Sequence, residues 1–132
     1  MDQPARAYKI LIIDDEECLR EIYEKIIKKR FGADRVECVC LQHSKGADYL
    51  LLDRVFDLVI SGINQPQEDG LTFLTRMRNQ GVSVPWIICT GMVDEELKEA
   101  VRYRFQCAYI NKPIDAASFL KTVTKALGHS DE

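Results

Sequence analysis

The chain has 132 residues, about the length at which one domain can bury its own hydrophobic core. Its composition, 46% hydrophobic and 30% charged with a formal net charge of −3, is that of a globular domain. This composition lacks the excess of positive charge with which a domain binds a nucleic-acid backbone, so nucleic-acid binding is disfavoured and a protein partner is favoured.

The ends of the chain and its hydropathy pattern predict one cytoplasmic domain. Residues 1–7 and 128–132 are expected to be loose ends, and residues 8–127 the core of a single domain spanning residues 1–132. No apolar segment reaches the ~18 residues that a membrane-spanning helix needs. The first apolar run, Ile10–Ile13, ends at two aspartates, which a secretory signal does not tolerate.

Without export, disulfides are not expected, and we interpret the cysteines as buried, reduced thiols. They are Cys18, Cys38, Cys40, Cys89 and Cys107.

Short apolar runs rich in β-branched residues alternate along the chain with longer stretches of helical periodicity. The five predicted strands are residues 8–13, 35–40, 57–61, 85–90 and 107–111. The first three helices are predicted from Leu19 to Phe31, over residues 44–54 with Ser44 as N-cap, and from Leu71 to a stop before Gly81. The last two are predicted from the N-cap Asp94 past Val101 and from the N-cap Asp115 to Leu127. Such alternation is typical of a parallel sheet joined by crossover helices.

Two of the predicted strands are apolar without interruption, over Leu58–Ile60 and Trp86–Ile88. A strand that is buried on both faces has this pattern, so we expect a sheet with helices on both sides. Ligands of such α/β sheets bind at the carboxyl ends of the strands, and functional residues are therefore sought there. These ends bear Asp14-Asp15 after the first strand, Ser61-Gly62 after the third, Thr90-Gly91 after the fourth and Lys112-Pro113 after the fifth.

The residue types at these ends point to phosphate chemistry. Adjacent carboxylates at Asp14 and Asp15 suit Mg²⁺, which takes one or two carboxylates and completes its shell with water and phosphate oxygens. The hydroxyl of Thr90 and the ammonium of Lys112 suit a phosphoryl group. Each has an ordinary explanation when taken alone, because acidic residues are favoured in the first turn of any helix and a lysine is often only a solvated charge. Their occurrence together, each at its own strand end, indicates a site.

With these motifs the chain resembles the receiver domains of response regulators in two-component signalling, over Tyr8 to Leu127. The resemblance implies a flavodoxin-like, doubly wound α/β fold with five parallel strands in the order 2-1-3-4-5 and helices on both faces. It also implies a cis peptide bond between Lys112 and Pro113. It implies that Asp14 and Asp15 form the metal-binding acidic pair, that Thr90 and Lys112 support the phosphoryl group, and that Tyr109 is the switch aromatic.

Gly62 departs from the family's pattern, because the family places its phosphoacceptor aspartate at this position. Ser61 does not replace that aspartate, since successive residues of a strand point to opposite faces and a serine hydroxyl does not form an acyl phosphate. We therefore assign no catalytic residue and interpret the site as a receiver pocket with a vacant phosphoacceptor position.

The missing carboxylate changes the electrostatics that we expect in the pocket. Three close carboxylates call for a cation, whereas two carboxylates and one lysine nearly balance one another. We therefore expect Lys112 to lean toward Asp14 or Asp15. Mg²⁺ is expected to bind weakly at best, through one carboxylate, the backbone carbonyl of Asn64 and water.

The leading hypothesis is a receiver-like signalling domain, not an enzyme, that binds proteins independently of phosphorylation through the surface of its fourth helix, fifth strand and fifth helix. Its expected partner is a histidine kinase, a phosphotransfer protein, an output domain or another receiver; a membrane, a nucleic acid or a small-molecule substrate is not expected. One alternative is an ordinary phosphoacceptor receiver with an inactivating Asp→Gly change, natural or engineered. Another is a flavodoxin-like small-ligand domain, which is disfavoured because no glycine-rich loop follows the first strand and its acidic residues would repel a nucleotide or flavin phosphate.

Overall fold

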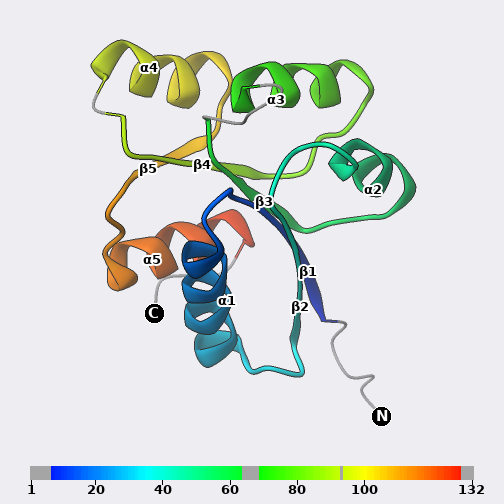
Figure 1. The fold of residues 1–132 in the computed structure, drawn as a ribbon, viewed down its shortest axis with the longest axis vertical. Coiled ribbons are helices and arrows are strands. Elements are labelled where there is room, and N and C mark those ends of the chain that lie inside the picture. Colours follow the sequence, from blue (N-terminus) through cyan, green and yellow to red (C-terminus); the bar gives the residue numbers. More distant parts are fainter. Residues whose placement is uncertain (1–6, 64–68, 93, 129–132) are drawn as a thin grey trace.

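The computed structural model describes residues 7–63, 69–92 and 94–128, and its centre is a five-stranded parallel sheet (Figure 1). The strands are β1 (Tyr8–Ile13), β2 (Val36–Leu41), β3 (Leu58–Ser61), β4 (Trp86–Thr90) and β5 (Ala108–Asn111). Their order is β2-β1-β3-β4-β5, and every pairing is parallel. The predicted doubly wound α/β fold and its strand order are confirmed.

Helices cover both faces of the sheet, and alternate residues of the strands are buried in two separate clusters, one on each face. The helices are α1 (Glu17–Phe31), α2 (Ala47–Asp53), α3 (Gly70–Asn79), α4 (Glu95–Glu99), η1 (Ala100–Arg104) and α5 (Ala116–Ala126). Ile10 and Ile12 pack against residues of α1 and α5, whereas Leu11 and Ile13 pack against residues of α2, α3 and η1. Figure 1 shows α1 and α5 together on one side of the sheet. Among the described helices, none is both long and apolar enough to span a membrane.

The helix starts are fixed mainly by aspartate side chains. Asp94 and Asp115 cap α4 and α5 as predicted. The carboxylate of Asp94 accepts hydrogen bonds from two backbone N–H groups of the first turn, and that of Asp115 accepts one, from the Ser118 N–H. Asp69 caps α3 in the same way, accepting from the N–H groups two and three residues on. The prediction that Ser44 caps the second helix is wrong. Gly46, with a φ of 88°, is the residue before α2, and Ser44 is buried in the preceding turn.

The fourth predicted helix is divided into two kinds of turn. After α4 the chain widens into the π-helical turn η1, in which the Phe105 N–H donates to the Ala100 carbonyl at 3.0 Å. Val101 is fully buried, and its carbonyl accepts from the Cys107 N–H at 2.9 Å. The chain passes through Gln106, with a φ of 56°, into β5. The periodicity of buried residues does not distinguish an α-turn from this wider one.

The cysteines are free thiols, but they are not uniformly buried. Cys18 is exposed at the start of α1, which contradicts the prediction for that residue. Cys89 and Cys107 are buried, and Cys38 and Cys40 are half-buried on the same face of β2 against the α1 and α5 side. Burial is the main cause that raises the pKa of both Cys38 and Cys89 to about 12. These two thiols therefore stay protonated and unreactive near neutral pH.

Candidate functional site

The acidic end of β1 is built around Asp14, whose side chain is only 2% exposed. Its carboxylate accepts a hydrogen bond from the Glu16 N–H at 2.9 Å, which turns the chain from β1 into α1. Its backbone carbonyl accepts from the guanidinium of Arg20 at 2.7 Å, one turn into that helix. The local fold thus fixes the orientation of Asp14, while Asp15 is left exposed to solvent.

Lys112 reaches from the end of β5 to this carboxylate. Its Nζ lies 3.0 Å from Asp14 Oδ2 and 3.8 Å from Glu16 Oε1, in an ion pair rather than an aligned hydrogen bond. The Lys112 N–H donates to the Thr90 carbonyl at 2.8 Å, and the peptide bond to Pro113 is cis. The predictions that this bond is cis and that Lys112 leans toward one carboxylate of the acidic pair are confirmed, and that carboxylate belongs to Asp14.

Replacing Lys112 by methionine should destabilise the fold. Removing one partner of a buried ion pair costs about 3–5 kcal/mol, and because Lys112 is 19% exposed we expect a smaller loss, about 2 kcal/mol at pH 7. Added Mg²⁺ should recover part of this loss, since a cation can then take the place of the ammonium beside Asp14. Urea unfolding with and without Mg²⁺ measures both effects. Lys25→Met, on the exposed side of α1, is the matched control. An unchanged stability in Lys112→Met would show that the ion pair contributes nothing.

Gly62 lies at the carboxyl end of β3, buried between the strands that carry Asp14 and Thr90. Its N–H donates to the Ile13 carbonyl at 3.1 Å. Unlike four other glycines of the described chain, Gly62 does not have a positive φ. Its backbone conformation is therefore one that residues with a side chain also adopt. A turn therefore does not require glycine at this position.

The side chain of Ser61 points away from the pocket. Its hydroxyl accepts a hydrogen bond from the indole N–H of Trp86 at 2.9 Å, and Trp86 belongs to the cluster on the α2 and α3 side. Gly70, the first residue of α3, lies against the end of β3, where its N–H donates to the Ile63 carbonyl at 2.8 Å. A Cβ atom at Gly70 would lie 2.1 Å from the Gly62 carbonyl oxygen, so the close approach of α3 to the end of β3 requires glycine at position 70.

Thr90 and Tyr109 are tied to the chain that follows β4. The buried Thr90 hydroxyl accepts from the Met92 N–H at 3.1 Å, and the Tyr109 hydroxyl donates to the Met92 carbonyl at 2.9 Å. The side-chain amide of Asn111 donates to the same carbonyl at 3.0 Å. Three side chains therefore hold Met92, in an arrangement that we call the Met92 clamp. The role of Asn111 was not predicted; its only sequence signal is its place directly before Lys112.

The acidic end of β1 also offers oxygen ligands for a metal. Asp14, Asp15 and Glu16 each provide one carboxylate oxygen, and these atoms lie within 4.8 Å of one another. Such ligands fit Mg²⁺, but the ammonium of Lys112 already lies against Asp14 and would compete with the cation. Asn64, predicted to contribute its carbonyl, falls outside the described residues.

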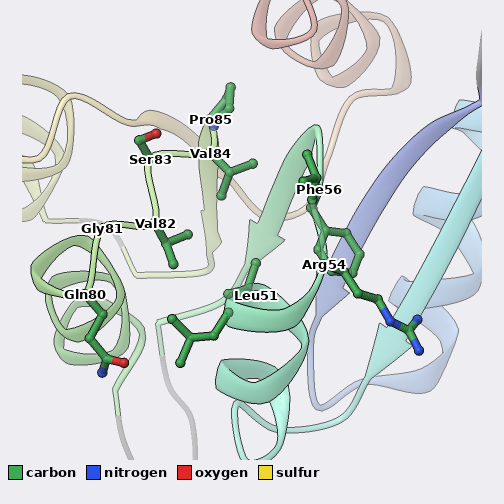
Figure 2. Close-up of a pocket in the computed structure, with 11 residues that line it drawn as sticks. Leu51, Arg54, Phe56, Gln80, Gly81, Val82, Ser83, Val84 and Pro85 are labelled. Carbon is green, nitrogen blue, oxygen red and sulfur yellow. The ribbon is translucent and has the colours of Figure 1, made fainter.

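A separate hollow of about 460 Å³ lies at the other end of the strands, beside the amino ends of β3 and β4. It is bounded by the end of α2, the turn before β3 and the segment between α3 and β4. Figure 2 shows Leu51, Val82 and Val84 around it, with the side chain of Arg54 extending away. None of the residues at the carboxyl ends of the strands lines this hollow, so it is distinct from the acidic pocket.

Comparisons with known proteins agree with this geometry. The family model of the response regulator receiver domain matches residues 10–124. The regulatory protein AtoC of Escherichia coli (strain K12) is 30% identical over 123 residues, covering 90% of this chain and 25% of AtoC. The DNA-binding transcriptional regulator NtrC of the same strain is 26% identical over 125 residues, covering 93% of this chain and 25% of NtrC. The chain thus spans about a quarter of the length of these relatives.

Solved structures show the same fold. The signal receiver domain of an HD domain-containing protein from Pseudomonas fluorescens Pf-5 superposes with a TM-score of 0.82 and 27% identity, covering 97% of this chain and 92% of that one. The chemotaxis protein CheY4 of Vibrio cholerae gives a TM-score of 0.78 and 23% identity, covering 93% and 100% of the two chains.

Proposed function

Because the chain belongs to the response regulator receiver domain family, we propose that it is a receiver domain without a phosphoacceptor, in which Gly62 occupies the position of the family's aspartate. It acts as a signalling module rather than as an enzyme. Its output is a protein–protein contact that does not depend on phosphorylation. The proposal treats residues 1–132 as one domain, whose phosphoacceptor position is vacant.

The observation that carries the proposal is the place of Gly62 in the sheet. It ends the central strand β3, between β1, which leads to Asp14, and β4, which ends at Thr90. Lys112, from the neighbouring strand end, contacts Asp14 instead of a carboxylate at position 62. An acyl phosphate needs a carboxylate nucleophile, which Ser61 does not have. The hydroxyl of Ser61 also points away from the pocket, where it accepts a hydrogen bond from Trp86 on the other side of the sheet.

Mg²⁺ has a reduced role in such a domain. Asp14 and Asp15, with the backbone carbonyl of Asn64, would hold the ion, and its chemistry there would be to neutralise the oxygens of a phosphoryl group. Since Lys112 balances the charge of Asp14 directly, we propose that the domain keeps its structure without Mg²⁺ and binds the ion weakly.

The partner that we propose is a histidine kinase, a phosphotransfer protein, an output domain or another receiver. The relatives AtoC and NtrC are regulators about four times as long as the matched segment, which leaves room in such proteins for output domains. The contact surface that we propose is formed by α4 with η1, β5 and α5. The Met92 clamp supports this choice, because it joins the end of β4 to β5 and so fixes part of that surface.

The proposal is tested by incubating the chain with acetyl phosphate and Mg²⁺ and measuring its intact mass. We expect no gain of a phosphoryl group, because no carboxylate stands at position 62 to attack phosphorus. A receiver that has the family's aspartate is the positive control. A stoichiometric gain of one phosphoryl group, labile to hydroxylamine, would contradict the proposal.

The backbone at Gly62 favours a second candidate function. Since an aspartate fits that backbone conformation, the domain also fits an ordinary receiver in which an Asp→Gly change has removed the phosphoacceptor. The two candidates differ in whether phosphorylation, once restored, alters the surface of β5 and α5.

A further inference from the structure

A groove of about 450 Å³ runs between η1 and α5, with the starts of β4 and β5 at its base. Three cations line it, and no carboxylate does. Arg102 comes from η1, and Lys121 and Lys125 come from α5. All three side chains belong to exposed residues, so their charges face solvent around the groove.

These three cations are not neutralised within the described part of the chain. None of them makes an ion pair there, in contrast to Lys28 and Lys112, which contact carboxylates. Glu99 lies one turn before Arg102 without pairing with it, and Asp115 is occupied in capping α5 through Ser118.

The position of the two lysines makes the absence of counter-charges notable. Lys121 and Lys125 are four residues apart on α5, a spacing that puts like charges side by side and destabilises a helix. The helix dipole favours Arg102 and Lys125, which lie in the last turns of η1 and α5, but it does not account for Lys121. An anionic group brought by another molecule would complement all three charges.

The base of the groove offers a second kind of contact. β5 is an edge strand that pairs only with β4 in the described sheet, so the other side of its backbone can accept a further strand. Ala108 at the start of β5 and Ala126 on α5 line the groove with small apolar side chains. Tyr109, which belongs to the Met92 clamp, lines it as well.

We propose that this groove binds an acidic, extended segment of a partner protein, laid along β5 with its carboxylates against Arg102, Lys121 and Lys125. The inference rests on the proposed function, because it gives the chemical class of the partner at the surface named there. A polypeptide supplies both carboxylates and the backbone groups that an open strand edge pairs with. A nucleic acid supplies only the negative charge, and the net charge of −3 opposes its binding.

The test uses the whole chain and a fluorescein-labelled peptide in which glutamate alternates with valine, followed by fluorescence anisotropy. We expect saturable binding, and an affinity at least about tenfold lower for the double variant Lys121→Glu, Lys125→Glu and for Arg102→Glu. The same peptide with glutamine in place of glutamate should bind at least about tenfold more weakly to the unchanged chain.

The matched control is Lys25→Glu with Lys29→Glu, which makes the same charge change at the same spacing on exposed positions of α1. Its affinity for the glutamate peptide should stay within about twofold of the unchanged chain. No binding by the unchanged chain, an equal loss in this control, or tighter binding of a single-stranded oligonucleotide than of the peptide would each overturn the proposal. The acetyl phosphate test does not involve the groove, so either proposal can fail while the other stands.

Discussion

Replacing Gly62 by aspartate is expected to give a chain that takes up one phosphoryl group from acetyl phosphate in the presence of Mg²⁺, where the unchanged chain takes up none. The new carboxylate would end β3 beside Asp14, and the repulsion between close carboxylates favours a divalent cation over the single charge of Lys112. The carboxylate oxygen then attacks phosphorus, and acetate leaves with the bonding electrons of the broken P–O bond. Thr90 and Lys112 already occupy neighbouring strand ends.

Intact mass measures the uptake, and Gly62→Asn, which has the same shape without the charge, should show none. A folded Gly62→Asp chain that takes up no phosphoryl group would show that the pocket lacks more than its nucleophile. The hydroxylamine lability of the added group identifies it as an acyl phosphate.

The same variant separates the two candidate functions. We expect phosphorylation to change amide chemical shifts near Asp14 and Thr90 but not along α5, because the Met92 clamp already holds Tyr109 through its hydroxyl and does not require a phosphoryl group. Chemical-shift changes that extend across β5 and α5 would instead indicate an ordinary receiver switch, with Gly62 as an inactivating change.

Replacing Gly70 by alanine should cause the largest loss of stability among these variants. The added Cβ would lie 2.1 Å from the Gly62 carbonyl oxygen and 3.0 Å from Ile63 Cα, and both are backbone atoms that cannot rotate away. We expect the free energy of unfolding to fall by about 3 kcal/mol or more, as in severe overpacking. Helix propensity alone predicts the opposite sign, since alanine is better than glycine inside a helix by about 1 kcal/mol.

Gly91→Ala is the control for this substitution. Gly91 has no atom within 4 Å of a built Cβ and no positive φ, so its replacement should change the free energy of unfolding by no more than about 0.5 kcal/mol. Urea unfolding measures both variants. Equal stabilities would show that the start of α3 can shift away from β3 at little cost.

The parts of the fold that could be predicted are those that depend on local chemistry. Uninterrupted apolar strands indicated a sheet covered on both faces, and Asp94 and Asp115 indicated two helix starts. The contact between Lys112 and Asp14 followed from charge balance once both were assigned to the carboxyl ends of strands of the same parallel sheet. The strand order came from the resemblance to receivers, because parallel strands with similar helices can be arranged in more than one order.

The parts that could not be predicted depend on where the backbone goes in three dimensions. The Met92 clamp converges on a backbone carbonyl, which every residue has and no sequence pattern marks. The wider turn at η1 depends on one shifted hydrogen bond, from Phe105 to Ala100, within an otherwise helical pattern. Ser44 has the chemistry of a helix cap, but the left-handed conformation of Gly46 starts α2 later.

Because Trp86 is hydrogen-bonded to Ser61, its fluorescence reports on the end of β3, next to position 62. Trp86 is the only tryptophan of the chain and is 3% exposed, with its ring edge-on to Phe73 at 5.7 Å between centroids. Its indole is therefore shielded from water, and its emission should shift to longer wavelength when the chain unfolds. Since Ser61 directly precedes Gly62, a substitution at position 62 that displaces the end of β3 would alter this emission in the native state, without any label.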